Sequence, residues 1–135
     1  ELYNLEQSSI DNDTYLKSIL RQLFKELNII KNQLMLEQKE LLTTLIILLL
    51  DKKKNNGIVI VIGDGLVCIN GKITEFDQDN KPDYIGFHLS EDFDNWYKLQ
   101  TQKISFENIQ DISIATDGIL MFDKIKNIQS HLYHP

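Results

Sequence analysis

Apolar residues in the first third of the chain recur at intervals of three and four. The set comprises Leu16, Ile19, Leu20, Leu23, Phe24, Leu27 and Ile30. Because an α-helix turns once in about 3.6 residues, these side chains share one helical face. Asp11, Asn12 and Asp13 stand just before the pattern and are good N-caps. The spacing predicts a helix over about residues 13–31 whose apolar face covers a core.

The pattern then changes to two apolar runs that flank a polar segment. Residues 45–50 contain only leucine and isoleucine, residues 58–62 read Ile-Val-Ile-Val-Ile, and the polar segment ends in Asn56-Gly57. Leucine favours helix, so the first run alone is undecided, but β-branched residues favour strand. The two runs therefore predict a hairpin. Since neither alternates with polar residues, we expect both strands to be covered on both faces.

A second hairpin is predicted directly after the first. Gly63-Asp64-Gly65 ends the second strand, and Asn70-Gly71 joins the short runs 66–69 and 72–76. Asn-Gly between two strands is a strong hairpin signal. Residues 43–77 therefore predict an antiparallel β-meander.

The remaining pattern predicts one short helix and one more strand. Ser90 precedes a helix expected over about residues 91–100, with Phe93, Trp96 and Tyr97 on one face. Aromatic faces can stack bases, but the acidic surroundings favour core packing. Residues 111–116 read as an apolar strand. Together the elements predict a single α+β domain over residues 1–135, with an antiparallel β-sandwich and flanking helices.

Composition narrows the class of protein. Of 135 residues, 42% are hydrophobic and 25% charged, as in soluble globular proteins, and the net charge is −6. An acidic chain is a poor partner for nucleic acid or an anionic membrane. The longest apolar-rich run, residues 41–50, is half of the roughly 20 residues that span a membrane. With one cysteine, Cys68, and no signal-peptide pattern, we expect a reduced, cytoplasmic setting.

Two apolar strands end in the same dipeptide, Asp-Gly. Asp64 follows residues 60–63, and Asp117 follows residues 112–116 with Gly118 after it. A carboxylate at the end of a buried strand is held at the rim of the sheet, and hard divalent cations take such oxygen ligands. The alternative is that each Asp-Gly is an ordinary turn in which the aspartate bonds its own backbone. Spacing alone leaves both interpretations open.

The order of these segments resembles the metal-dependent PPM-type (protein phosphatase 2C-like) Ser/Thr phosphatases. The similarity covers about residues 43–122. It includes Thr43-Thr44 before a strand, the segment Val61-Ile62-Gly63-Asp64-Gly65, and the later segment Ile112–Gly118 ending in Thr-Asp-Gly. The resemblance implies an αββα sandwich with Mn²⁺ or Mg²⁺ at one edge of the central sheets.

The same resemblance implies a function for individual residues. Asp117 would be a ligand of the paired metal site, Asp64 would lie near an additional metal, and Gly118 would keep the rim open. The substrate would be a phosphoprotein, and a metal-bound water would hydrolyse its phosphoserine or phosphothreonine without a phosphoenzyme.

The chain also departs from the family pattern. The early Asp-Gly-x-Gly segment and the final acidic ligand pair are not found, and Gly65 replaces the usual serine. We therefore expect the chain to be the middle and later part of a phosphatase domain. One alternative is a non-catalytic pseudophosphatase or protein-interaction module. Another is an unrelated acidic ligand-binding domain, which predicts that Asp64 and Asp117 lie far apart.

Overall fold

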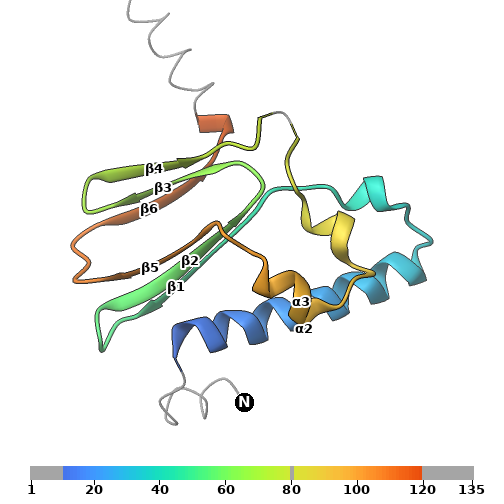
Figure 1. The fold of residues 1–135 in the computed structure, drawn as a ribbon, viewed down its shortest axis with the longest axis horizontal. Helices are drawn as coiled ribbons and strands as arrows, with labels where there is room; N and C mark the ends of the chain where they lie inside the picture. Colours follow the sequence, from blue (N-terminus) through green and yellow to red (C-terminus); the bar gives the residue numbers. More distant parts are fainter. Residues whose placement is uncertain (1–10, 80, 120–135) are drawn as a thin grey trace, which may run out of the picture.

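The computed structural model describes residues 11–79 and 81–119, so residues 120–122 of the family-like region lie outside it. Among these residues the fold contains two α-helices, two short 3-10 helices and two three-stranded antiparallel sheets, and is of the α+β class (Figure 1). The elements, in chain order, are α2 (Asn12–Gln33), η1 (Gln38–Leu41), β1 (Leu45–Asp51), β2 (Asn56–Ile62), β3 (Gly65–Ile69), β4 (Lys72–Phe76), η2 (Ile85–His88), α3 (Phe93–Lys98), β5 (Lys103–Glu107) and β6 (Ile112–Thr116).

Helix α2 forms where the three-and-four spacing of apolar residues predicts it. The side chain of Asp11 caps it by accepting a hydrogen bond from the backbone N–H of Thr14 at 2.7 Å. Leu16, Leu20 and Phe24 form its buried stripe. The helix thus lays one apolar face on the first sheet and exposes its polar side to solvent.

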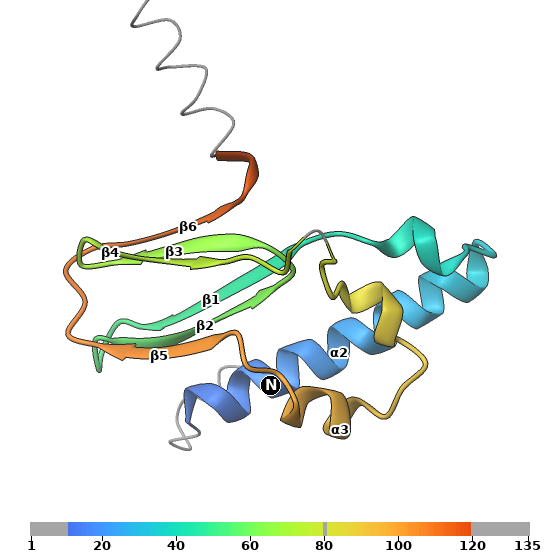
Figure 2. The same cartoon turned by 45° about the horizontal axis from the view of Figure 1, so that its top comes forward.

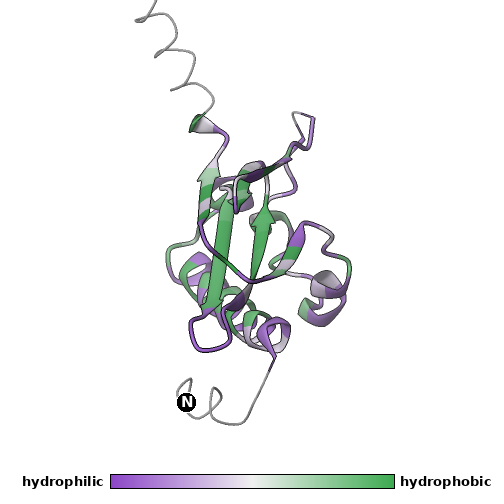
Figure 3. Ribbon diagram, turned by 90° about the vertical axis from the view of Figure 1, so that its left-hand side faces the viewer, coloured by the Kyte–Doolittle hydropathy of each residue, from purple (hydrophilic) through white to green (hydrophobic). Residues whose placement is uncertain are grey.

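The six strands are divided between two sheets. One has the order β1-β2-β5 and the other β4-β3-β6. Figure 2 shows the two sheets one above the other, with α2 and α3 on the outer side of β1-β2-β5. The strands are coloured largely green in Figure 3, which marks hydrophobic residues.

Strand β2 is the centre of the packing because its alternate residues serve two cores. Ile58, Ile60 and Ile62 face the helices and join a core that includes the buried residues Leu16, Leu20, Phe24, Ile85, Leu89, Trp96 and Tyr97. Val59 and Val61 point to the other side, where they pack with Val67 of β3. Both faces of β2 are therefore covered, as the uninterrupted β-branched run predicts.

The aromatic face of α3 belongs to the helix-side core. The rings of Phe93 and Trp96 lie 5.0 and 4.7 Å from that of Phe24, measured between centroids. Trp96 and Tyr97 are buried. These rings are packed against protein, so they do not form an open platform on which bases could stack.

Several predictions differ from the structure. The meander over residues 43–77 is wrong as a single sheet, because the bend at Gly63 and Asp64 carries the chain from one sheet to the other. Strand β1 is an edge strand and only half-buried, whereas coverage on both faces was expected. The N-cap of α3 is Asp92, whose side chain accepts a hydrogen bond from Asn95, and not Ser90.

Strand β5 was not predicted at all, although Ile104 and Phe106 alternate with polar residues in it.

Within the described residues, no helix is both long and apolar enough to cross a membrane.

Candidate functional site

The two predicted Asp-Gly segments lie at the same end of sheet β4-β3-β6. Strands β3 and β6 are antiparallel, with Gly65 opposite Thr116. Asp64 immediately precedes Gly65, and Asp117 immediately follows Thr116. Their backbone positions therefore flank one cross-strand pair, although they are far apart in the chain. This register brings the two backbone positions to one end of the sheet, whereas the alternative of an unrelated ligand-binding domain predicts that Asp64 and Asp117 lie far apart.

Asp64 lies in the tight bend between the two sheets. Gly63, just before it, has φ +102°, and a Cβ there would lie 3.0 Å from Oγ1 of Thr44. Glycine tolerates this conformation, which other residues rarely adopt. The half-buried carboxylate of Asp64 accepts a hydrogen bond from the backbone N–H of Gln78 at 2.8 Å. Asp64 therefore does not bond its own turn, as the plain-turn alternative requires, but a loop 14 positions later.

Asp117 has a different environment, because it is exposed at the end of β6. Its carboxylate makes no hydrogen bond or ion pair with any residue that the structure describes. A Cβ on the following Gly118 would meet only Oγ1 of Thr116, at 3.7 Å. The edge beside Asp117 is thus open to solvent, and the described neighbours would also admit a small side chain at position 118.

A third aspartate at this edge was not singled out from the sequence. Gly65 also pairs with Phe76 of β4, so Asp77 follows that strand at the same end of the sheet. The available signal was the repeated arrangement of a strand followed at once by aspartate. The carboxylate of Asp77 accepts a hydrogen bond from the backbone N–H of Asp79 at 2.9 Å, which stabilises the turn.

The acidic edge is better suited to a weakly bound divalent cation that keeps several waters than to a cation surrounded by protein ligands. Over residues 11–79 and 81–119, no three His, Cys, Asp or Glu side chains are grouped so that they could hold a metal ion. Mg²⁺ commonly binds through one or two carboxylates and keeps several waters. The oxygen donors of Asp64 and Asp117 fit such an ion in chemical type, with the remaining ligands supplied by water or by other parts of the protein.

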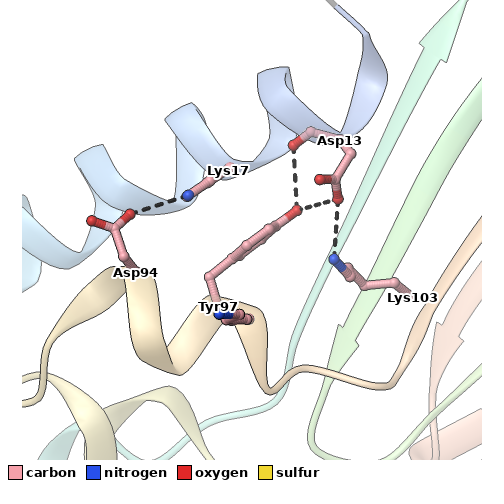
Figure 4. Close-up of a pocket in the computed structure, with 6 residues that line it drawn as sticks. Asp13, Lys17, Asp94, Tyr97 and Lys103 are labelled. Atoms are coloured by element: carbon pink, nitrogen blue, oxygen red, sulfur yellow. Dashed lines mark hydrogen bonds and ion pairs between the residues drawn. The ribbon is translucent and has the colours of Figure 1, made fainter.

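A second cluster of charged residues lies on the helix side, away from this edge. An open depression there has a volume of about 550 Å³ and is lined by Asp13, Lys17, Asp94, Tyr97, Lys98 and Lys103; Figure 4 shows all of them except Lys98 with labels. Asp13 accepts hydrogen bonds from the Tyr97 hydroxyl at 2.7 Å and from Lys103 Nζ at 3.0 Å. One carboxylate thereby connects α2, α3 and β5. This contact was not predictable from a local sequence pattern, because Asp13 and Lys103 are 90 positions apart.

The ionisation of this cluster agrees with a structural role. Burial opposes ionisation of Asp13, but the hydrogen bonds from Tyr97 and Lys103 and the charges of Lys103 and Lys17 hold its pKa below the ordinary value. Burial and the nearby Asp13 raise the pKa of Tyr97, so its hydroxyl stays protonated and donates. The network attaches the helices to the first sheet, and two of its three lysines are paired with acids.

Comparison with known proteins identifies the family of the chain. A family model described as protein phosphatase 2C matches residues 2–133, which is almost the whole chain. Comparison with curated proteins and with solved structures found no match.

Proposed function

The chain belongs to the protein phosphatase 2C family, and from this premise we propose that it contributes to a metal-dependent phosphatase acting on phosphoserine and phosphothreonine in proteins. The single observation that supports the proposal most is the Gly65–Thr116 pair, which brings the backbones of Asp64 and Asp117 to one sheet edge. Mn²⁺ or Mg²⁺ is the proposed cofactor, and a cytoplasmic setting remains a prediction.

In this proposal the two aspartates have complementary parts. Asp117, exposed and without a bond to described residues, would offer its carboxylate to a cation. Asp64 would offer the oxygen that does not accept the N–H of Gln78. When bound, the cations would supply an activated water for hydrolysis. The acidic edge would also repel the substrate phosphate unless a cation were present, so activity should require added metal.

We also propose the αββα sandwich of the family as the complete architecture. Two sheets and one helical layer are present among the described residues. The outer face of β4-β3-β6 carries Ile73, which is 67% exposed, and the half-buried residues Leu66 and Cys68. Such a face is suited to burial beneath a further helical layer, since an apolar sheet face normally packs against another element.

The test compares metal-dependent hydrolysis by the full-length protein and by three variants. With p-nitrophenyl phosphate and Mn²⁺, Asp117→Ala and Asp64→Ala should each lower the rate by at least about tenfold, as expected for lost metal ligands or their neighbours. Asp111→Ala is the control, because Asp111 is exposed at the opposite end of β6. Equal rates for the unsubstituted protein and Asp117→Ala would exclude the proposed role of Asp117.

The second candidate function is that of a non-catalytic relative that binds proteins. It is favoured by the lack of a three-acid group in the part of the chain that the structure describes. Calorimetric titration with Mn²⁺ separates the two candidates. Heat of binding that disappears in Asp117→Ala supports the phosphatase, and no heat from the full-length protein supports the pseudophosphatase.

A further inference from the structure

Two glutamines in loops next to strands of different sheets meet beside Asp64. Gln78 follows β4, and Gln102 precedes β5. The side-chain Nε2 of Gln78 donates to Oε1 of Gln102 at 3.3 Å. Nε2 of Gln102 donates in turn to the backbone carbonyls of Val61 and Gly63, each at 2.9 Å. The pair therefore bridges the two sheets where the chain crosses from one to the other.

The bonding pattern leaves one arrangement of the two amides. Because Nε2 of Gln102 faces two carbonyl oxygens, its own oxygen must point away, toward Gln78. Gln78 must then present Nε2, which leaves its Oε1 to accept the backbone N–H of Asp83 at 2.6 Å. Both side chains are half-buried, so an amide turned the other way would place oxygens against oxygens with little water to relieve the repulsion.

The same loop holds Asp64. The backbone N–H of Gln78 donates to one carboxylate oxygen of Asp64, while its side chain is fixed by Gln102 and Asp83. Asp83 is itself held, because its carboxylate contacts the ring of His88. The position of the Gln78 N–H thus depends on bonds to three separate segments of the chain.

We propose that Gln78 and Gln102 are positioning residues for Asp64, which they orient at the acidic edge. The inference rests on the proposed function, because it takes Asp64 to lie beside a bound divalent cation. One oxygen of Asp64 accepts the Gln78 N–H, so the direction of the other oxygen is set by the loop. Mutation of a residue that hydrogen-bonds to a metal ligand typically lowers metal affinity by about 10- to 100-fold.

The test replaces each amide by a side chain of similar length that cannot repeat its hydrogen bonds, in Gln78→Met and Gln102→Met. Amide hydrogen exchange followed by NMR reports the Gln78 N–H, and calorimetry reports Mn²⁺ affinity in the full-length protein. We expect exchange at Gln78 to quicken about tenfold in Gln102→Met, and Mn²⁺ affinity to fall about tenfold in both variants.

Two controls separate positioning from general loss of stability. Gln22→Met alters an exposed glutamine of α2 and should change neither measurement. Asn70→Gly removes a side chain that bonds residues 108, 110 and 111 at the opposite end of β3, and glycine suits its φ of +51°. This variant should lower the melting temperature but leave Mn²⁺ affinity unchanged.

Each remaining outcome has a distinct meaning. Unchanged exchange at Gln78 in Gln102→Met overturns the inference, whatever the metal does. Faster exchange with unchanged Mn²⁺ affinity also overturns it, because the loop would then move without affecting the site. If the unsubstituted protein does not bind Mn²⁺, the proposed function is overturned, and the positioning role is overturned as a consequence.

Discussion

The two sheets of this protein are built from similar strands but are covered differently. Sheet β1-β2-β5 lies between the helices and the second sheet, and its central strand is buried on both faces. Sheet β4-β3-β6 has one buried face, and described residues leave Ile73 on its other face largely exposed. Asp64, Asp77 and Asp117 all lie at one end of the second sheet. The comparison indicates that the first sheet supplies most of the stability, and that the second presents the chemistry.

The largest test of this difference replaces one isoleucine in each sheet. Ile60 is fully buried in β2, so Ile60→Ala should lower the free energy of unfolding by about 3 kcal/mol through lost burial and a cavity. Ile73→Thr keeps a β-branched residue on the exposed face of β4, so in the 135-residue chain alone it should change stability by less than about 0.5 kcal/mol, and by more in a protein where the proposed further helical layer covers this face. Urea denaturation of both variants measures the two effects. A large cost at Ile73 would mean that the second sheet is covered in the folded protein.

The sequence predicted the hairpins of both sheets and strand β6, but it did not predict strand β5 or the division of the strands into two sheets, for physical reasons. Local patterns carry the information for α2 and for the hairpin of β1 and β2, because helical spacing and β-branched runs act over a few residues. The division into two sheets depends on which face of β2 each later strand covers. That is decided by packing of Val59, Val61 and Val67 across the molecule, and no short window contains it.

The candidate site was likewise only partly predictable from local sequence patterns. Asp64 and Asp117 were found because each follows an apolar strand, and the structure adds that one cross-strand pair joins their ends. The bonds that hold Asp64 were not predictable, since Gln78 and Gln102 are polar loop residues with no local pattern. Their partners lie up to 41 positions away.

A medium-sized effect is expected where the two sheets touch. A Cβ at Gly65 would lie 2.9 Å from Cδ1 of Ile46 and 3.2 Å from the carbonyl oxygen of Ala115. Gly65→Ser should therefore cost about 1–2 kcal/mol by overpacking. Gly118→Ser is the control, because among the described residues its Cβ would make only an ordinary van der Waals contact, with Oγ1 of Thr116 at 3.7 Å. Thermal unfolding compares the two, and equal costs would show that the sheets can separate slightly at this edge.

A smaller effect should appear where α2 is attached to the first sheet. The pKa of Asp13 is lowered on folding, so its ionised form stabilises the protein above its ordinary pKa, and that contribution is lost as pH falls through the lowered value. Because the side chain is 52% exposed, the contribution is about 0.5–1 kcal/mol. Asp13→Asn should therefore flatten the decline in unfolding free energy as the pH falls below about 5. If the decline in unfolding free energy at acid pH were the same in Asp13→Asn, the contact to Lys103 would add nothing to stability.

The smallest effect on stability should come from the residue proposed to matter most for activity. Asp117 is exposed and unbonded by described residues, so Asp117→Ala should change the free energy of unfolding by less than about 0.5 kcal/mol. Asp64→Ala should cost about 1 kcal/mol, because the half-buried N–H of Gln78 loses its acceptor. Denaturation in metal-free buffer measures both. If Asp117→Ala were as costly as Asp64→Ala, the Asp117 carboxylate would already be bonded within the protein, and it could not serve as a free ligand at this edge.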